Sequence, residues 1–125
     1  MDIKIKYSSK DPIYLQIKNQ IRDAILNDQL DPGEPLPSIR LLAKELKVSV
    51  ITTKRAYDEL EKDGLINTVP GKGSFIKSQD PKIIKEKLMI KIEEHAEQII
   101  NLAKIGNISK EEIDSLFDIL EDSDD

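Results

Sequence analysis

Only three residues, Lys47-Val48-Ser49, separate two stretches of helical periodicity, and this short link limits the folds open to the chain. A link of this length holds two helices at a steep angle, as in a helix-turn-helix. The second stretch stops at Gly64, and Pro70-Gly71-Lys72-Gly73 then joins two strand-like runs, Leu65–Val69 and Ser74–Ile76. Such a glycine-tipped connection indicates a β-hairpin, so the pattern predicts a winged helix-turn-helix.

The residues at the ends of each apolar stretch predict where the helices begin and end. Asp11 has the character of a helix cap with Pro12 at the first helical position, and the Asp31-Pro32-Gly33 turn follows that helix. Ser38 and Ser49 are the predicted caps of the second and third helices. The predicted buried faces carry Ile13, Ile17, Ile21, Ala24 and Ile25 in the first helix, Ile39, Leu42, Ala43 and Leu46 in the second, and Thr53, Ala56, Tyr57 and Leu60 in the third.

The two ends of the chain differ from this middle part. Alternating apolar and polar residues over Met1–Lys10 predict a short extended arm. From Lys82 to Ile105, apolar residues at spacings of three and four predict one long helix, ended by Gly106-Asn107. Ser109 and Glu112 have the spacing of a capping box that begins a final helix, which gives way to the acidic tail Glu121–Asp125. We therefore expect a mainly α fold with a small β-hairpin.

The composition excludes several classes of protein. The chain has no cysteine, which excludes disulfides and thiolate chemistry and fits a reducing cytoplasm. Its single histidine, His95, leaves no Ser-His pair and no multi-histidine metal cluster, and a packed or interfacial role suits it better than ligation. No run reaches about 18 apolar residues and no signal-type stretch opens the chain. We expect a cytoplasmic protein without membrane association, enzymatic activity, metal or cofactor.

The charge is unevenly distributed over a net charge of −5. Residues 1–80 hold 13 Lys/Arg and 12 Asp/Glu, whereas residues 81–125 hold 6 and 12. The stretch from Ser38 to Lys77 is basic, with 8 Lys/Arg and 5 Asp/Glu. A basic segment of this kind can meet phosphates although the whole chain is acidic.

The basic stretch includes the start of the third predicted helix. Small, hydroxyl and aliphatic side chains there allow close approach to base edges and thymine methyl groups, and a helix N-terminus favours phosphate. Lys72, between two glycines at the hairpin tip, can reach a DNA backbone or minor groove. Residues of the third helix with these properties are Ser49, Val50, Ile51, Thr52, Lys54 and Arg55.

Several motifs together resemble the GntR family of bacterial transcription regulators, in particular its short YtrA-type branch. The stretches that carry the resemblance are Pro12–Ile17, Pro32–Ala43, Ala56–Glu61 and Gly71–Ile76. The resemblance implies that Arg40 contacts DNA, that residues 49–52 and Lys54 contact operator bases and phosphates, and that Gly71 and Lys72 enter the minor groove. Some relatives carry a base-reading arginine where this chain has Val50, which favours an operator read through thymine methyl groups and shape.

The final 45 residues after Asp80 are too few for a sensory domain of the wider family. Two amphipathic helices can instead pair with a second copy, which places two recognition helices about one DNA turn, ~34 Å, apart. We therefore expect a DNA-binding domain over residues 1–80 and a two-helix dimerisation segment with an acidic tail over residues 81–125. The predicted dimerisation residues are Ile84, Leu88, Ile92, Ala96, Ile99, Leu116 and Phe117.

The leading interpretation is a dimeric, sequence-specific DNA-binding repressor, which by resemblance acts on its own operon and neighbouring transporter genes. A protein-interaction adaptor built on a winged domain is the alternative, although it would not need basic groups on the third helix and hairpin tip. Other readings also stay open at single positions: Arg40 could pair with a carboxylate such as Glu45, and Lys54 and Arg55 could form a solvated helix face. Both terminal helices could fold back on the winged domain, and a small-molecule effector is left undetermined.

Overall fold

In the computed structural model, which describes residues 1–123, the chain divides at Asp80 into two units. The expected mainly α fold with a small hairpin is confirmed. The first unit contains the three helices α1 (Ile13–Leu26), α2 (Ile39–Leu46) and α3 (Val50–Lys62), followed by strands β1 (Ile66–Val69) and β2 (Gly73–Ile76). The second unit contains α4 (Pro81–Gly106) and α5 (Lys110–Asp122).

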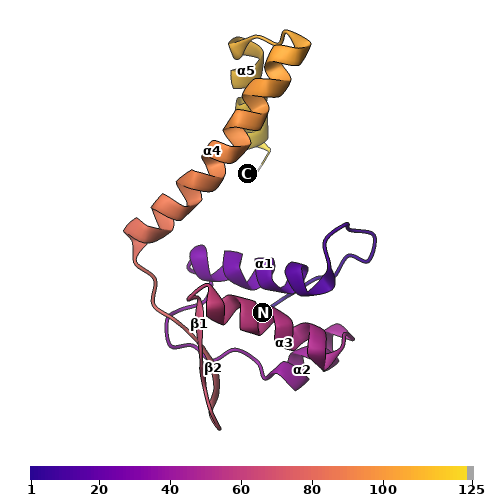
Figure 1. The fold of residues 1–125 in the computed structure, drawn as a ribbon, viewed down its shortest axis with the longest axis vertical. Coiled ribbons are helices and arrows are strands. Elements are labelled where there is room, and N and C mark those ends of the chain that lie inside the picture. The colour runs from indigo at the N-terminus through magenta and orange to yellow at the C-terminus, as the bar shows by residue number, and fades with distance from the viewer. Residues whose placement is uncertain (124–125) are drawn as a thin grey trace. The chain divides into compact units, whose positions relative to one another are not determined.

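The core of the first unit forms where α1 lies along α3 (Figure 1). Ile17 and Ile21 of α1 and Leu60 of α3 are completely buried, and Ala56 and Tyr57 join them. Full burial of an isoleucine or leucine stabilises a fold by about 1.5–3 kcal/mol relative to exposure. The predicted helical stripes of α1 and α3 are thus confirmed as the main source of the core.

The caps of α2 and α3 are the two predicted serines. The Ser38 hydroxyl accepts a hydrogen bond from the Leu41 N–H at 3.1 Å, and the Ser49 hydroxyl accepts one from the Thr52 N–H at 3.0 Å. Between them, Lys47 adopts a left-handed conformation (φ 58°) that ends α2 and turns the chain into α3. The Tyr57 hydroxyl donates to the Pro37 carbonyl at 2.7 Å and so ties α3 to the segment before α2.

The start of α1 differs from the prediction. Pro12 is extended (ψ 152°), so the helix begins at Ile13, and no side chain caps its N-terminus. The prediction of an Asp11 cap with Pro12 as the first helical residue is wrong, because Pro12 itself occupies the cap position; in front of the helix, a bond to Asp11 comes from Gln16. Its side-chain amide donates to the Asp11 carbonyl at 3.0 Å and thereby shapes the chain in front of the helix.

The N-terminal arm is held against α1 by glutamine side chains. The Gln20 amide accepts from the Lys4 N–H at 2.9 Å and donates to the Lys4 carbonyl at 2.8 Å. Gln16 forms the same pair of bonds with the backbone of Lys6, at 2.8 and 3.0 Å. The arm buries Ile3 and is extended up to Lys6, but residues 7–10 form a turn, so the prediction of an extended arm holds only for its first part.

The wing is an antiparallel hairpin whose register pairs Ile66 with Ile76 and Val69 with Gly73. Gly71 at its tip has φ 77°, a conformation that favours glycine. Leu65 lies before β1, because its N–H closes the end of α3 by donating to the Leu60 carbonyl at 3.0 Å. Compared with the predicted strands, β1 starts one residue later and β2 starts one residue earlier.

The second edge of β2 is also occupied. The Ile76 N–H donates to the Glu34 carbonyl at 2.9 Å, and the Leu36 N–H donates to the Ser74 carbonyl at 2.9 Å. The segment between α1 and α2 thus braces the wing from the side opposite β1. The loop adds one isolated bridge, between Pro35 and Phe75, to a sheet whose two strands are β1 and β2.

The second unit is a helical hairpin without a buried residue among those the structure describes. The predicted capping box of α5 is confirmed: the Ser109 hydroxyl accepts from the Glu112 N–H at 3.2 Å, and the Glu112 carboxylate accepts from the Ser109 N–H at 2.9 Å. Glu121 and Asp122 of the predicted tail belong to α5, and Ser123 caps its C-terminus. The last two tail residues, Asp124 and Asp125, lie outside the described residues. No helix within residues 1–123 is long and apolar enough to cross a membrane.

Candidate nucleic-acid interface

The outer face of α3 begins with two exposed aliphatic side chains. Ile51 is 81% exposed and Val50 is 46% exposed, whereas Thr53, Ala56 and Leu60 point into the core. The prediction that Ile51 points outward is confirmed. Exposed aliphatic groups at the start of a helix are suited to contact thymine methyl groups in a major groove.

Ser49 and Thr52 form a small hydroxyl pair at the same end of α3. The Ser49 hydroxyl donates to the Thr52 hydroxyl at 2.8 Å while it accepts from the Thr52 N–H. The Ser49 hydroxyl proton is therefore donated within the cap, whereas the Thr52 hydroxyl can still donate its own proton to an outside acceptor. This end of the helix also carries the positive end of the helix dipole, which favours a phosphate.

Two cations follow on the exposed face of α3, and each has a different neighbour. The Lys54 ammonium lies 2.8 Å from the Asp58 carboxylate, one helical turn further on, and both side chains are mostly exposed. An exposed pair of this kind contributes only about 0.3–0.5 kcal/mol, so a phosphate can compete for Lys54. The Arg55 guanidinium carbon lies 3.7 Å from the centroid of the Tyr14 ring on α1.

Arg40 and the wing tip flank this face. Arg40 is exposed in the first turn of α2, and within residues 1–123 it forms no ion pair with Glu45 or any other carboxylate. Gly71 and Lys72 are exposed at the end of the hairpin. In Figure 1, α2 and the wing both lie on the side of α3 away from α1, near opposite ends of the helix. Arg40 and the start of α3 thus lie at one end of the helix and the wing at its other end, on the same side of α3.

The angle between α2 and α3 depends on Tyr57. Burial, with a further contribution from the nearby Glu45 carboxylate, raises the pKa of Tyr57 above its usual value of 10.0. The phenol therefore stays protonated at neutral pH and keeps donating to Pro37. This bond holds the first turn of α2, with Arg40, relative to α3.

A charged cluster holds α1 against α3 at the other end of the recognition helix. The Lys18 ammonium lies 3.0 Å from the Asp63 carboxylate and 3.4 Å from that of Glu59. Burial by itself lowers the pKa of Lys18, but the hydrogen bonds and charges of these carboxylates outweigh it and raise that pKa. Since Asp63 and Glu59 are engaged with Lys18, they lie on the α1 side of α3 and do not neutralise Lys54.

Sequence reasoning missed two contacts: the ring of Tyr14 against Arg55, and the carboxylate of Asp58 on Lys54. The Lys54–Asp58 spacing of four residues is a signal that could have been recognised, since such positions are neighbours on a helix. Tyr14 carried no signal, because its contact joins two different helices. Among the described residues, no group of three His, Cys, Asp or Glu side chains could hold a metal ion.

Comparison with known proteins identifies a family and close relatives. The family described as "Bacterial regulatory proteins, gntR family" matches residues 13–76. The "HTH-type transcriptional repressor YtrA" of Bacillus subtilis (strain 168) is 34% identical over 111 residues, which cover 89% of this chain and 85% of that protein.

Solved structures agree with this match. A crystal structure titled "Transcriptional Antiterminator from Listeria monocytogenes EGD-e" is 35% identical, with a TM-score of 0.74, and the match covers 97% of this chain and 90% of that one. The structure of AraR(DBD) in complex with operator ORX1 is 25% identical, with a TM-score of 0.54, and covers 61% and 95% of the two chains.

Proposed function

The chain belongs to the GntR family of bacterial regulatory proteins, a family of DNA-binding transcription regulators and not of enzymes, and on this premise we propose that it represses transcription as a homodimer on a near-palindromic operator. Repression is proposed because the relative YtrA of Bacillus subtilis is a transcriptional repressor. A dimer bound across a promoter would block access to it by steric occlusion.

The observation that carries the proposal is the open outer face of α3. Val50 and Ile51 offer aliphatic groups at the helix start, and Lys54 and Arg55 offer cations one turn further on. Aliphatic groups suit thymine methyl groups, and cations suit phosphates. The operator is then read through thymine methyl groups and DNA shape, with no guanine contact from position 50.

Residues beside α3 complete the proposed interface. Arg40 contacts DNA from the first turn of α2, and Ser49 and Thr52 approach a phosphate with the open N-terminus of α3. Gly71 and Lys72 insert into the minor groove, where the absence of a side chain on Gly71 permits close approach. Phosphate contacts of this kind position the protein, whereas contacts to base edges select the sequence.

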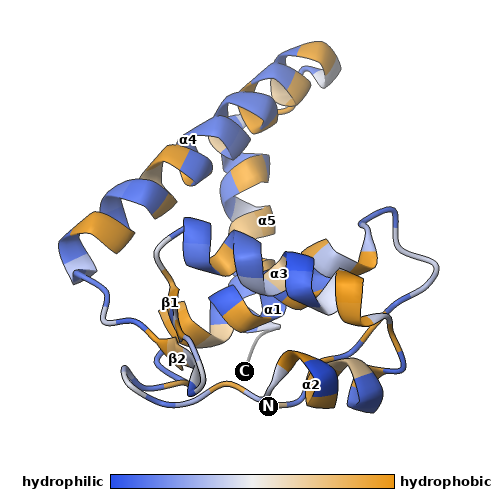
Figure 2. Cartoon of the chain, turned by 60° about the horizontal axis from the view of Figure 1, so that its bottom comes forward, coloured by the Kyte–Doolittle hydropathy of each residue, from blue (hydrophilic) through white to orange (hydrophobic). Residues whose placement is uncertain are grey.

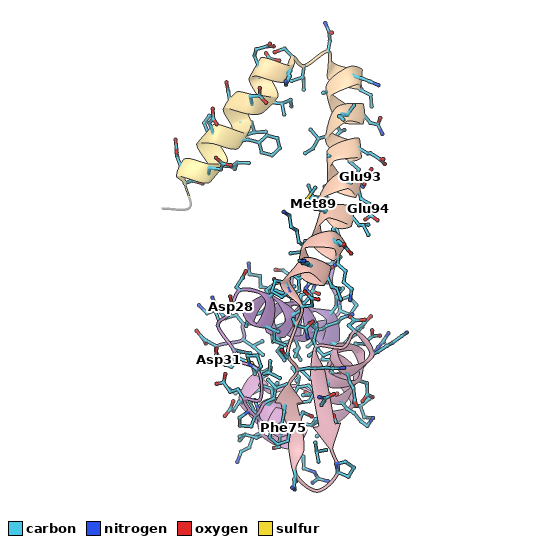
Figure 3. All side chains as sticks on the ribbon, turned by 90° about the vertical axis from the view of Figure 1, so that its left-hand side faces the viewer. Asp28, Asp31, Phe75, Met89, Glu93 and Glu94 are labelled. Atoms are coloured by element: carbon cyan, nitrogen blue, oxygen red, sulfur yellow. The ribbon has the colours of Figure 1, made fainter. Side chains whose placement is uncertain are left out.

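The apolar surface of the second unit supports a second copy as its partner. None of its described residues is buried, and Ile92 and Phe117 are 57% and 45% exposed. Figure 2 shows hydrophobic segments recurring along both α4 and α5, and in Figure 3 Met89 and Glu94 project from different sides of α4. A helix with distinct apolar and charged sides buries the apolar one against a partner. The proposed dimerisation residues are Ile84, Leu88, Ile92, Ala96, Ile99, Leu116 and Phe117.

Binding-site selection from random duplexes with the purified full chain tests the DNA part of the proposal. The parent should enrich one near-palindromic sequence and shift it in a gel, in a complex that weakens with salt. Arg40→Ala and Lys54→Ala should each weaken this complex about 5- to 150-fold, because each removes a contact worth about 1–3 kcal/mol. Arg22→Ala is the matched control, because it removes the same charge from α1, where Arg22 pairs with Asp23.

The outcomes separate the alternatives. Failure to enrich any duplex would refute DNA recognition and favour the adaptor interpretation. Equal binding by Arg40→Ala, Lys54→Ala and the parent would refute the assigned interface. For the dimer, sedimentation should give twice the chain mass of 14.2 kDa for the parent and a monomer for Ile92→Glu. A parent that sediments as a monomer at micromolar concentration would refute the dimer.

A further inference from the structure

We infer that Tyr14 is a positioning residue for DNA binding: its ring holds the Arg55 guanidinium at the α1 edge of the α3 face, with the N–H groups directed to a phosphate. This inference rests on the proposed function and adds a residue of α1 to the interface. It also assigns Arg55 to phosphate binding and not to base reading.

The geometry is that of a cation stacked on an aromatic ring. The Arg55 guanidinium carbon lies 3.7 Å from the Tyr14 ring centroid, well inside the limit of about 6 Å for a cation–π contact. Tyr14 is half-buried and packs against the hydrophobic core, whereas Arg55 is exposed. The ring is thus a fixed platform, and the arginine is a solvent-facing group held on it.

The stack leaves the donors of Arg55 available. A guanidinium that stacks through its flat face keeps its five N–H groups in the plane, directed outward. Within residues 1–123 no carboxylate pairs with Arg55, although Lys54 beside it is paired with Asp58. Arg55 is therefore the cation of this face that meets no competing anion.

The position of Arg55 on α3 places it at the border of the groove-facing surface. Arg55 follows the exposed Ile51 by four residues, so both lie on one strip of the helix. Glu59, four residues further, reaches Lys18 of α1 at 3.4 Å, so this strip leads towards α1. A side chain at the border of a recognition helix meets the DNA backbone and not the base edges, which favours phosphate as its ligand.

The first turn of α1 adds to the positive potential at this border. It contains no acidic residue, and no side chain caps it, so the positive end of the helix dipole lies open at this border. A long arginine side chain normally loses conformational freedom when it binds. Since Tyr14 orders Arg55 beforehand, the loss on DNA binding is smaller.

A double-mutant cycle on the selected duplex tests the inference, with fluorescence anisotropy of the full chain measured at several salt concentrations. Arg55→Ala should flatten the slope of log K against log salt by about 0.9, as expected for one lost phosphate contact. Tyr14→Leu, which keeps an apolar group against the core, should weaken binding about two- to fivefold, and Tyr14→Phe, which keeps the ring, should bind like the parent. Combined with Arg55→Ala, Tyr14→Leu should cause no further loss.

Several results would overturn the inference while the proposed function stands. These are an unchanged salt slope in Arg55→Ala, parental affinity in Tyr14→Leu, or losses of affinity that simply add in the double variant. In each case, DNA binding by Arg40→Ala and Lys54→Ala would still be weakened. Circular dichroism at the assay temperature verifies that each variant is folded. Because Arg55 is exposed, Arg55→Ala should remain folded. Its salt slope therefore tests the phosphate contact even if Tyr14→Leu fails to fold.

Discussion

Replacing Tyr57 by Phe removes one atom and tests how the helix-turn-helix angle is held. The Tyr57 side chain is buried, and its hydroxyl donates to the Pro37 carbonyl at 2.7 Å. A hydrogen bond of this kind contributes about 0.5–1.5 kcal/mol, and an acceptor left without a donor in a partly buried place adds to the loss. We therefore expect Tyr57→Phe to lower the free energy of unfolding by about 1–2 kcal/mol.

Urea denaturation followed by circular dichroism measures this change. The midpoint should fall while the slope of the free energy against urea stays the same, since the surface exposed on unfolding is unchanged. In a thermal scan, a loss of 1 kcal/mol lowers Tm by about 4–8 °C for a unit of this size. DNA binding should weaken as well, because the first turn of α2 carries Arg40 and is no longer tied to α3.

Tyr7→Phe is the matched control. Tyr7 is 72% exposed, and its hydroxyl makes no hydrogen bond within residues 1–123, so its loss should leave the urea midpoint unchanged. If Tyr57→Phe is as stable as the parent, or if Tyr7→Phe loses as much, the hydroxyl bond does not hold the two helices and the reasoning is refuted.

Three further variants or conditions probe the same unit. Burial raises the pKa of Tyr57, so the folded state holds the phenol proton more strongly than the unfolded state does, and the free energy of unfolding is constant below about pH 10 and falls above it. Urea midpoints across pH 8–11 should show this fall, and the fall should be smaller in Tyr57→Phe. Asp58→Asn frees Lys54 and should tighten binding to a mixed-sequence duplex about two- to fivefold at low salt. Asp28→Asn, the same charge change in the loop after α1, should have a smaller effect, and equal gains in affinity by fluorescence anisotropy would contradict the pairing. Gly71→Ala should cost about 1 kcal/mol at its positive φ and speed amide exchange of the Lys72 N–H, which donates to the Val69 carbonyl; unchanged exchange would show that the turn is not strained.

Helix identity and most helix ends were predictable from residues close together in the chain. Ser38, Ser49 and Ser109 cap their helices as expected, because a cap involves only residues two or three positions apart. The stripes of α1 and α3 were predictable for the same reason, since periodicity is a property of one segment. The family resemblance, which rested on such local motifs in the right order, is also confirmed.

The predictions failed where a contact outside the helical or strand pattern intervened. Pro12 occupies the cap position expected of Asp11, whose carbonyl accepts from the Gln16 side chain, and Leu65 lies before β1 because its N–H closes the end of α3. The backbone bonds between Glu34 and Ile76 and the stacking of Arg55 on Tyr14 join residues that no local pattern relates. Capping and amphipathic burial are set by short-range geometry within one segment of the chain. The Glu34–Ile76 bonds and the Arg55–Tyr14 contact form only after hydrophobic burial has brought separate segments together.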